Sequence, residues 1–267
     1  MAERATALIF DLDETLVADI RATREALAAA AGRRELRERH GADPDALARS
    51  VWDAAEQLWR GSPEVGYTEA IGMASWEGLW APFTADDPHL RALGAWAPEY
   101  RRAAWRRALD ALGAPSDEVL ADALQGAFER ERRALHLPFP DTRPALDLLR
   151  RDYRLVLLTN GAPDLQREKV AGAALGEYFA VIVASGDLGA GKPDPRIYRH
   201  TLDLLGVAPG EAAMIGDSLR NDVWGPQRVG IRGIWLCRTD DPDSGARDAD
   251  VRPDAVVRRL DEVESAL

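Results

Sequence analysis

The sequence of 267 residues contains a single cysteine, Cys237, and therefore cannot form an internal disulfide bond. It contains no apolar run long enough to span a membrane, and no basic region followed by an apolar stretch marks a signal peptide near its start. These absences argue against an oxidising compartment and against a membrane-embedded protein. We therefore expect a cytoplasmic protein with no membrane partner.

Positive charge is also scarce, since the formal net charge is −11 at pH 7. Nucleic acids and acidic membranes are bound through clustered lysine and arginine, so we expect no nucleic-acid partner. Lysine itself is rare: of the 34 basic residues only Lys169 and Lys192 are lysines, which leaves 32 arginines. The two lysines are informative, because an ammonium group is compact whereas a guanidinium group is a broad planar fork.

The chain is 46% hydrophobic and 30% charged, which is typical of a globular protein with a full core. An apolar run at residues 7–10 predicts a first strand, and amphipathic helical patterns follow it as far as residue 136. Beyond this point the pattern alternates between strands and helices. We expect strands at 155–158, 180–184, 212–215, 231–236 and 255–257, helices at 163–175, 194–206 and 220–229, and a polar loop at 239–253.

This alternation predicts an α/β fold with a doubly wound, Rossmann-like parallel sheet. Because the first strand belongs to that sheet, we expect residues 1–16 and 137–267 to form a catalytic core. Residues 17–136 would then be an inserted, all-helical cap domain. The insertion carries six of the eight tryptophans; we expect Trp52, Trp59 and Trp105 in its core, and Trp76 and Trp80 in a loop that could face the active site.

Two acidic residues follow the first strand in the segment Asp11-Leu12-Asp13-Glu14-Thr15. Side chains alternate across a strand, so Asp11 and Asp13 can face one cavity while Leu12 packs into the core. The carboxyl ends of parallel strands are where α/β proteins bind ligands. The spacing therefore allows one acid to act as a nucleophile and the other as a proton donor.

Three further polar segments fall at the ends of later strands: Thr159-Asn160-Gly161, Lys192 in a loop of glycine and proline, and Asp217 with Asp222 one turn on. Four carboxylates at neighbouring strand ends could not all stay ionised without a cation, and oxygen ligands of this kind suit magnesium, Mg2+. Lys192 and Thr159 would donate to phosphate oxygens, where charge gathers during phosphoryl transfer.

These four segments, in this order and spacing, resemble the sequence motifs of the haloacid dehalogenase superfamily, in the branch with a helical cap after the first motif. The resemblance is nearest to the N-acylneuraminate-9-phosphatase-like and phosphoglycolate-phosphatase-like enzymes. It implies that Asp11 attacks phosphorus and that Asp13 protonates the leaving group and then activates water. It also implies a metal site and a substrate site at the strand ends. The expected metal ligands are Asp11, Asp13 through its carbonyl, Asp217 and Asp222, and the expected substrate-binding residues are Thr15, Asn160 and Gly161.

Several alternatives stay open. Gly186 to Lys192 matches the start of a phosphate-binding P-loop, but Pro193 stands where that loop needs a serine or threonine hydroxyl. A 2-haloacid dehalogenase would not need the second acid, so Asp13 favours a phosphatase. A phosphonate hydrolase with a cap lysine is disfavoured, because residues 17–136 contain no lysine. A sugar phosphate mutase and a non-catalytic binding protein are the remaining possibilities.

We therefore predict a magnesium-dependent phosphomonoesterase that acts on a small phosphorylated metabolite through an aspartyl-phosphate intermediate. Lys192→Arg should damage such an enzyme. Lys169→Arg should be nearly silent, because we expect Lys169 to lie on a helix that points no strand end at the site.

Overall fold

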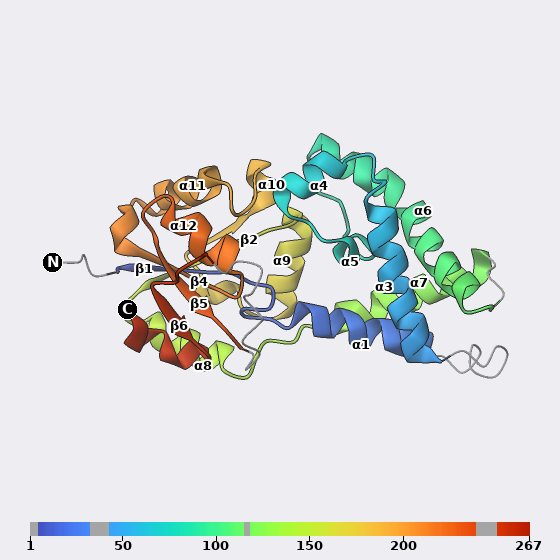
Figure 1. Ribbon diagram of the computed structural model, residues 1–267, viewed down its shortest axis with the longest axis horizontal. Coiled ribbons are helices and arrows are strands. Elements are labelled where there is room, and N and C mark those ends of the chain that lie inside the picture. Colours follow the sequence, from blue (N-terminus) through green and yellow to red (C-terminus); the bar gives the residue numbers. More distant parts are fainter. Residues whose placement is uncertain (1–4, 33–42, 115–117, 239–249) are drawn as a thin grey trace. The chain divides into compact units, whose positions relative to one another are not determined.

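The computed structural model describes residues 5–32, 43–114, 118–238 and 250–267. Contacts between Cα atoms divide the chain into two compact units, which we describe separately (Figure 1). Unit 1 comprises Met1–Ala18 and Leu137–Leu267, and unit 2 comprises Asp19–His136. Residues 33–42 and 115–117 of the region predicted to be helical as far as residue 136, and most of the polar loop predicted for 239–253, lie outside the described residues.

Unit 1 is built on one six-stranded sheet in which every neighbouring pair is parallel. The order of the strands is β3-β2-β1-β4-β5-β6, so β1 lies in the middle between β2 and β4. The predicted doubly wound α/β sheet is confirmed. Its strands are β1 (Ala7–Phe10), β2 (Arg154–Thr159), β3 (Val181–Ala184), β4 (Ala212–Gly216), β5 (Arg232–Leu236) and β6 (Ala255–Val257).

Both faces of the sheet are covered, and β1 is buried along its whole length. Leu8 and Phe10 pack into a core with α8 (Thr142–Leu149) and α9 (Pro163–Gly172), whereas Ala7 and Ile9 face α11 (Pro195–Leu205). In Figure 1, α11 and α12 (Gly225–Gln227) lie on one side of the strands and α8 on the other. A strand buried on both faces is apolar without alternation, which explains the run before Asp11.

Helix α11 begins at a side-chain cap that can be recognised in the sequence. The side chain of Asp194 accepts a hydrogen bond from the backbone N–H of Arg196, with Pro195 as the first helical residue of α11. The segment after β4 is different, because residues 219–224 form a π-helix, η3 (Leu219–Trp224), before α12. The remaining short helices are α10 (Ser185–Leu188), η1 (Gly176–Tyr178), η2 (Pro209–Glu211), η5 (Leu260–Glu262) and η6 (Glu264–Ala266).

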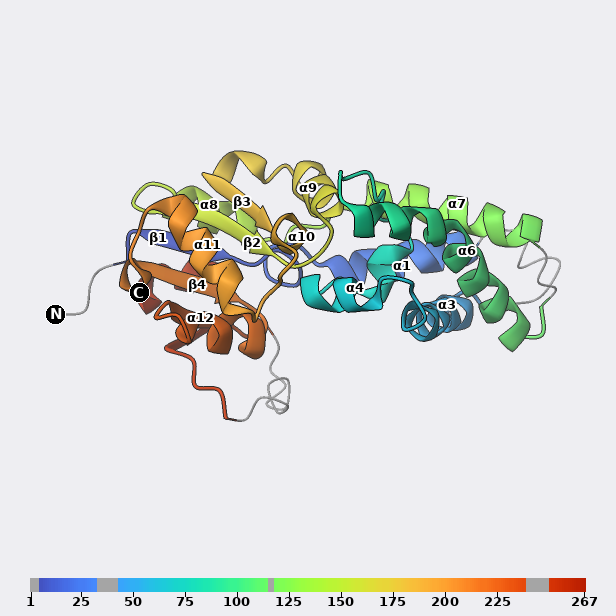
Figure 2. The same ribbon diagram turned by 90° about the horizontal axis from the view of Figure 1, so that it is seen from above.

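The described part of unit 2 is helical. In Figure 2 its long helices lie beside one another, and α3 packs against α1 and α6 while α7 packs against α1 and α6. Its helices are α1 (Asp19–Ala31), α3 (Pro44–Trp59), α4 (Val65–Ile71), α5 (Ser75–Gly78), α6 (Pro88–Ala111) and α7 (Glu118–Ala134).

Tryptophan fills much of the interior of unit 2. Trp59 and Trp105 are buried and Trp52 is half-buried, stacked on Trp76 with ring centroids 4.7 Å apart. Trp76 lies in α5, whereas Trp80 lies in the turn that follows it. Trp80 is fully buried beneath the guanidinium of Arg132, which lies 4.2 Å from its ring centroid.

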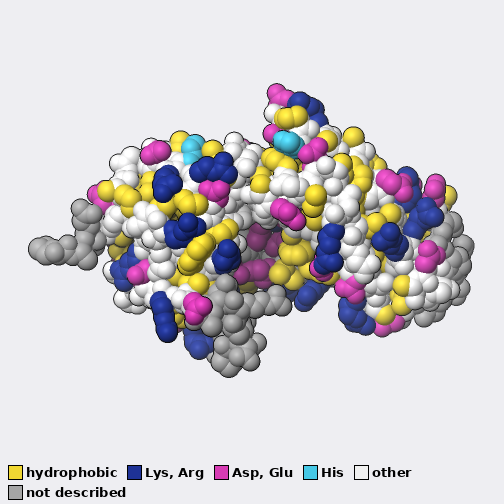
Figure 3. All heavy atoms as spheres, turned by 45° about the horizontal axis from the view of Figure 1, so that its top comes forward, with side chains coloured by type: hydrophobic (Ala, Val, Ile, Leu, Met, Phe, Trp, Pro, Cys, Tyr) yellow, Lys and Arg dark blue, Asp and Glu magenta, His cyan; other side chains and the backbone are white. Residues whose placement is uncertain are grey.

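Figure 3 shows acidic and basic side chains interspersed over the visible face, without a large basic patch. None of the described helices combines the length and the apolar character needed to cross a membrane.

Candidate active site

Three carboxylates converge at the carboxyl end of the sheet, from β1, from β4 and from η3. Oxygens of Asp11, Asp217 and Asp222 lie within 4.8 Å of one another. Asp11 follows β1 directly and Asp217 follows β4, and these two strands pair side by side. Asp222 comes from η3 and is completely buried. Among the described residues, this is the cluster whose spacing suits a single metal ion.

The hydroxyl of Thr15 joins two of these acids. Its oxygen lies 3.1 Å from Oδ2 of Asp11 and 3.4 Å from Oδ1 of Asp217, and it accepts a hydrogen bond of 3.1 Å from the backbone N–H of Asp217. Thr15 is fully buried. It therefore fixes the end of β1 against the end of β4.

Lys192 supplies a positive charge to the same cluster. Its Nζ donates to Oδ1 of Asp11 and to Oδ1 of Asp222, both at 2.7 Å, and its side chain is 2% exposed. Burial opposes the charged form of Lys192, yet the two carboxylates hold its pKa above the ordinary value. A buried ammonium with two anionic partners is therefore charged at neutral pH.

One ammonium does not balance three carboxylates. Burial raises the pKa of Asp222 to about 6, even though Lys192 acts in the opposite direction. Desolvation, together with the charges of Asp11 and Asp222, raises the pKa of Asp217 well above its usual value. The cluster therefore carries more negative charge than its own cation stabilises, and its oxygen donors fit a hard divalent cation.

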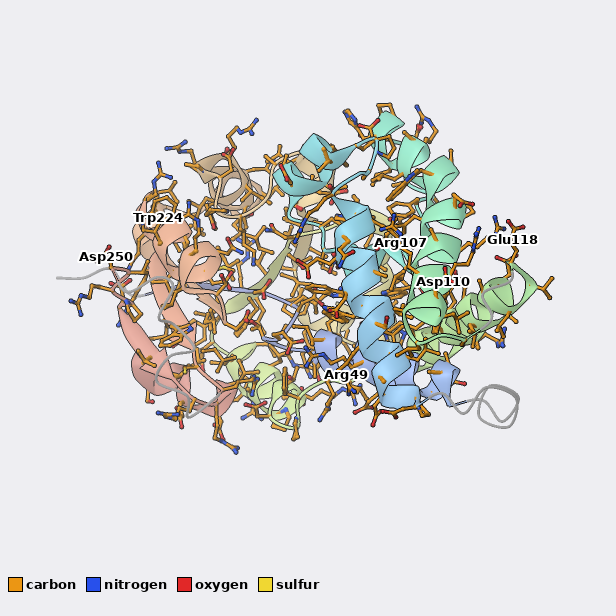
Figure 4. The ribbon with its side chains drawn as sticks, turned by 45° about the vertical axis from the view of Figure 1, so that its right-hand side comes forward. Arg49, Arg107, Asp110, Glu118, Trp224 and Asp250 are labelled. Carbon is orange, nitrogen blue, oxygen red and sulfur yellow. The ribbon has the colours of Figure 1, made fainter. Side chains whose placement is uncertain are left out.

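The π-helix η3 holds Asp222 in position. The backbone N–H of Ser218 donates to Oδ2 of Asp222 at 3.0 Å. A Cβ atom on Gly216 would lie 2.3 Å from the Asp222 carboxylate, so only glycine allows this close packing. At the far end of η3, Trp224, labelled in Figure 4, stacks against the guanidinium groups of Arg220 and Arg228.

The segment after β2 and the loop that carries Lys192 are tied together by Asn160. The amide of Asn160 donates to the carbonyl of Lys192 at 2.9 Å and accepts from the backbone N–H of Lys192 at 2.8 Å. This double hydrogen bond sets the main chain from which the Lys192 side chain reaches Asp11. The two segments were predicted to meet, and they do.

Thr159 and Gly161 flank Asn160 and are both buried. The Thr159 hydroxyl lies 3.1 Å from Oε1 of Gln166, and the backbone N–H of Gly161 donates to Oγ of Ser185 at 2.8 Å. Gly161 has a φ of +130°, a conformation that glycine adopts freely. The turn therefore depends on glycine at this position.

Asp13 stands apart from the three clustered carboxylates, because its side chain pairs with Lys169. Nζ of Lys169 lies 3.0 Å from both oxygens of the Asp13 carboxylate. The side chain of Lys169 is 2% exposed and that of Asp13 is 26% exposed. Lys169 therefore faces one of the predicted site residues, so the reason for expecting Lys169→Arg to be nearly silent does not hold.

Sequence reasoning missed Gln166 and Lys169, which lie one turn apart on α9 and face two of the predicted motifs. It also missed Arg238, which donates to the carbonyl of Thr15 at 2.8 Å and pairs with Asp141 at 3.1 Å. Two signals were available: the rarity of lysine in this chain, and the spacing of Gln166 and Lys169, because residues three apart on a helix share a face.

Comparisons with known proteins agree with this geometry. A model of the haloacid dehalogenase-like hydrolases matches residues 5–230. The phosphoserine phosphatase of Thermus thermophilus is 40% identical over 257 residues, which cover 96% of either chain. The N-acylneuraminate-9-phosphatase of Mus musculus is 34% identical over 140 residues, 52% of this chain and 56% of that protein. The crystal structure of a 2-haloacid dehalogenase from Pseudomonas syringae superimposes with a TM-score of 0.59 and 26% identity, covering 98% of this chain and 97% of that one.

Proposed function

We propose, because this chain belongs to the haloacid dehalogenase-like hydrolase family, that it is a phosphatase which uses a divalent cation, Mg2+, to hydrolyse a small phosphorylated metabolite. The observation that carries the proposal is the pair of acids after β1. Asp11 lies in the carboxylate cluster beside Lys192, and Asp13 lies next to it with a separate partner.

Asp11 is the nucleophile in this proposal. Its carboxylate attacks phosphorus, the bond from phosphorus to the leaving oxygen breaks, and an aspartyl phosphate forms. Asp13 gives a proton to that leaving oxygen and then takes one from the water that attacks the phosphorus of the aspartyl phosphate. A nucleophile and an acid-base at one strand end must be two carboxylates in different surroundings. Asp11, beside Lys192, and Asp13, beside Lys169, have this arrangement.

Five residues are proposed to hold the phosphate group. The Lys192 ammonium and the Thr159 hydroxyl stabilise the charge on the transferring phosphoryl oxygens. The substrate also lies against Thr15, Asn160 and Gly161 in this proposal. The loop geometry favours it, because the double hydrogen bond from Asn160 to the Lys192 main chain keeps the two phosphate-binding segments together.

The metal site is proposed at Asp11, Asp217 and Asp222, with the carbonyl of Asp13 as a further ligand. The raised pKa values of Asp217 and Asp222 support this proposal, because desolvation and neighbouring carboxylates outweigh the one ammonium of Lys192, and a divalent cation would offset that excess of negative charge. When bound, the cation would neutralise phosphate oxygens and lower the repulsion between the phosphate and Asp11.

Asp13 favours a phosphatase over a dehalogenase, although one similar structure is that of a 2-haloacid dehalogenase. Displacement of a halide needs no proton donor, whereas an alkoxide leaving group does. A phosphomutase would use the same groups, but it would return the phosphoryl group to a sugar rather than release inorganic phosphate.

O-phosphoserine is the first substrate to test, because the relative that is similar over nearly the whole chain is a phosphoserine phosphatase. N-acylneuraminate phosphates come second, since that likeness covers about half of the chain. We also propose that residues 17–136 act as the cap domain that selects the substrate. The cytoplasmic location and the absence of nucleic-acid and membrane partners stay predictions.

The decisive experiment measures release of inorganic phosphate from a panel of phosphorylated metabolites, with magnesium and with EDTA. We expect magnesium-dependent release from at least one metabolite and none in EDTA. Acid quenching followed by mass spectrometry should find the phosphoryl group on Asp11. Halide release from 2-haloacids without phosphatase activity, or full turnover in EDTA, would contradict the proposal.

A further inference from the structure

The surroundings of Asp13 contain a feature that the proposed chemistry does not yet use. Lys169 comes from α9, far along the chain, and reaches the Asp13 carboxylate with one nitrogen that lies 3.0 Å from each oxygen. Its side chain is 2% exposed. A buried ammonium must be paired, and here its pair is the carboxylate proposed to handle the protons of the reaction.

The main chain at Asp13 is already fixed by the turn that follows β1. The backbone N–H of Glu14 donates to the carbonyl of Val17 at 2.7 Å, and the N–H groups of Leu16 and Val17 both donate to the carbonyl of Leu12. The remaining freedom of Asp13 is the rotation of its side chain, which is partly exposed. A cation on both carboxylate oxygens removes that freedom.

The position of Lys169 is itself determined by the helix that carries it. Val170 packs into the core on the Leu8 and Phe10 face of the sheet, and Gln166 lies against the Thr159 hydroxyl. These contacts anchor α9 to the end of β2, the strand beside β1. The ammonium is therefore held at a set place relative to the end of β1.

We propose that Lys169 is a positioning residue: it orients the Asp13 carboxylate toward the leaving oxygen and the attacking water. Lys169 exchanges no proton and does not touch the phosphate. Misplacing a proton-transfer group by a small distance is costly, because general acid-base catalysis needs its donor and acceptor within hydrogen-bond reach. This inference rests on the proposed phosphatase function.

The test compares Lys169→Met with wild type on two substrates. With O-phosphoserine, whose leaving group needs a proton, we expect kcat to fall by roughly 10- to 100-fold and KM to change by less than about 3-fold, a part of the usual contribution of a general acid. With p-nitrophenyl phosphate, whose leaving group needs none, the burst of p-nitrophenolate should keep its rate. Its steady-state turnover should fall, because the attacking water still depends on Asp13.

A double-variant comparison separates positioning from a general structural effect. If Lys169 acts through Asp13, the variant carrying Asp13→Asn and Lys169→Met should be no slower than Asp13→Asn alone. Arg167→Met is the matched control on the same helix, because Arg167 pairs with Asp187 in an ion pair at the surface. We expect that control to keep wild-type activity.

Lys169→Arg provides a second variant if Lys169→Met folds poorly. It keeps the positive charge beside Asp13 but moves the donor atoms, so it should retain the fold and recover part of the activity. Four results would overturn the inference: a Lys169→Met enzyme as fast as wild type, a loss confined to KM, losses that multiply in the double variant, or a burst that slows as much as phosphoserine turnover.

The outcome for wild type keeps the two proposals distinct. A wild-type protein that releases phosphate from no phosphomonoester overturns the proposed function, and this inference fails with it. An active wild type with an equally active Lys169→Met variant overturns the role of Lys169 alone.

Discussion

Removal of the Lys192 ammonium is the perturbation whose effect the structure predicts most directly. Lys192 is the shared cation of Asp11 and Asp222, at 2.7 Å from each, and it is almost fully buried. Lys192→Met keeps an unbranched side chain of similar length but leaves two carboxylates without this partner. Breaking a buried ion pair by removing one member typically costs about 3–5 kcal/mol of unfolding free energy.

That cost corresponds to a fall in melting temperature of roughly 6–20 °C, since 1 kcal/mol is about 2–4 °C for domains of this size. We expect this fall in EDTA at neutral pH, measured by thermal unfolding followed by circular dichroism. Near pH 5 the loss should be smaller, because the pKa of Asp222 is raised to about 6 and its proton then removes one unpaired charge.

The phosphatase activity of Lys192→Met should fall further than its loss of stability alone explains. Loss of one donor to a developing negative charge costs about 10²- to 10³-fold in kcat. Lys192→Arg, which keeps the charge, should melt closer to wild type but lose at least ~10-fold in kcat/KM, because a guanidinium is too broad for the space between two carboxylates.

Arg60→Met is the control for both measurements, since Arg60 forms an exposed ion pair with Glu56 in unit 2. Exposed pairs contribute little, and we expect no measurable change. If Lys192→Met and Arg60→Met both have the melting temperature of wild type in EDTA, the Lys192 ammonium does not compensate the carboxylates. The reasoning is then refuted.

Three further predictions concern the acids of the site. Asp11→Asn should abolish turnover and prevent trapping of a phosphoryl group, with circular dichroism showing an intact fold; residual turnover with a trapped phosphoryl group elsewhere would exclude Asp11 as the nucleophile. Asp13→Asn should lower kcat on O-phosphoserine by ~10²- to 10⁴-fold, the usual contribution of a general acid-base, and unchanged kcat would remove Asp13 from the mechanism. In EDTA, the raised pKa values of Asp217 and Asp222 mean that the folded protein binds more protons than the unfolded chain, so its stability should fall as pH rises from about 4 to above 6. Magnesium should therefore raise the melting temperature more at neutral pH than near pH 5, and an equal rise at both would contradict this account.

The sequence allowed the sheet and the main site residues to be predicted because both depend on short-range pattern. Apolar runs marked the strands, and polar residues at the ends of those runs had to meet at one edge of a parallel sheet. Asp11, Asp217 and Asp222 lie together for this reason. The Lys192 loop was placed with them because it also follows a predicted strand, and its resemblance to a known motif supported that placement, since the composition of a glycine-rich loop does not by itself fix where it folds.

The parts that could not be predicted depend on packing. Lysine is the residue type most often found in solvent, so a lysine on a helix is ordinarily expected at the surface. The burial of Val170 and the contact from Gln166 to Thr159 orient α9 so that Lys169 reaches Asp13. The π-helix at 219–224 was missed for a related reason. It is accompanied by a hydrogen bond between the Ser218 main chain and the Asp222 side chain, and the spacing of apolar residues does not reveal it.

The lysine content of the chain acquires a physical meaning from these contacts. The two lysines, among 34 basic residues, are both almost fully buried, and each faces one acid of the first motif. Lys192 contacts Asp11, the proposed nucleophile, and Lys169 contacts Asp13, the proposed acid-base. Arginine serves wherever a solvated or broadly spread positive charge is enough, whereas these two places require a point charge on a slender stem in a closed space. The scarcity of lysine therefore agrees with the two roles proposed here, phosphate binding for Lys192 and positioning of Asp13 for Lys169.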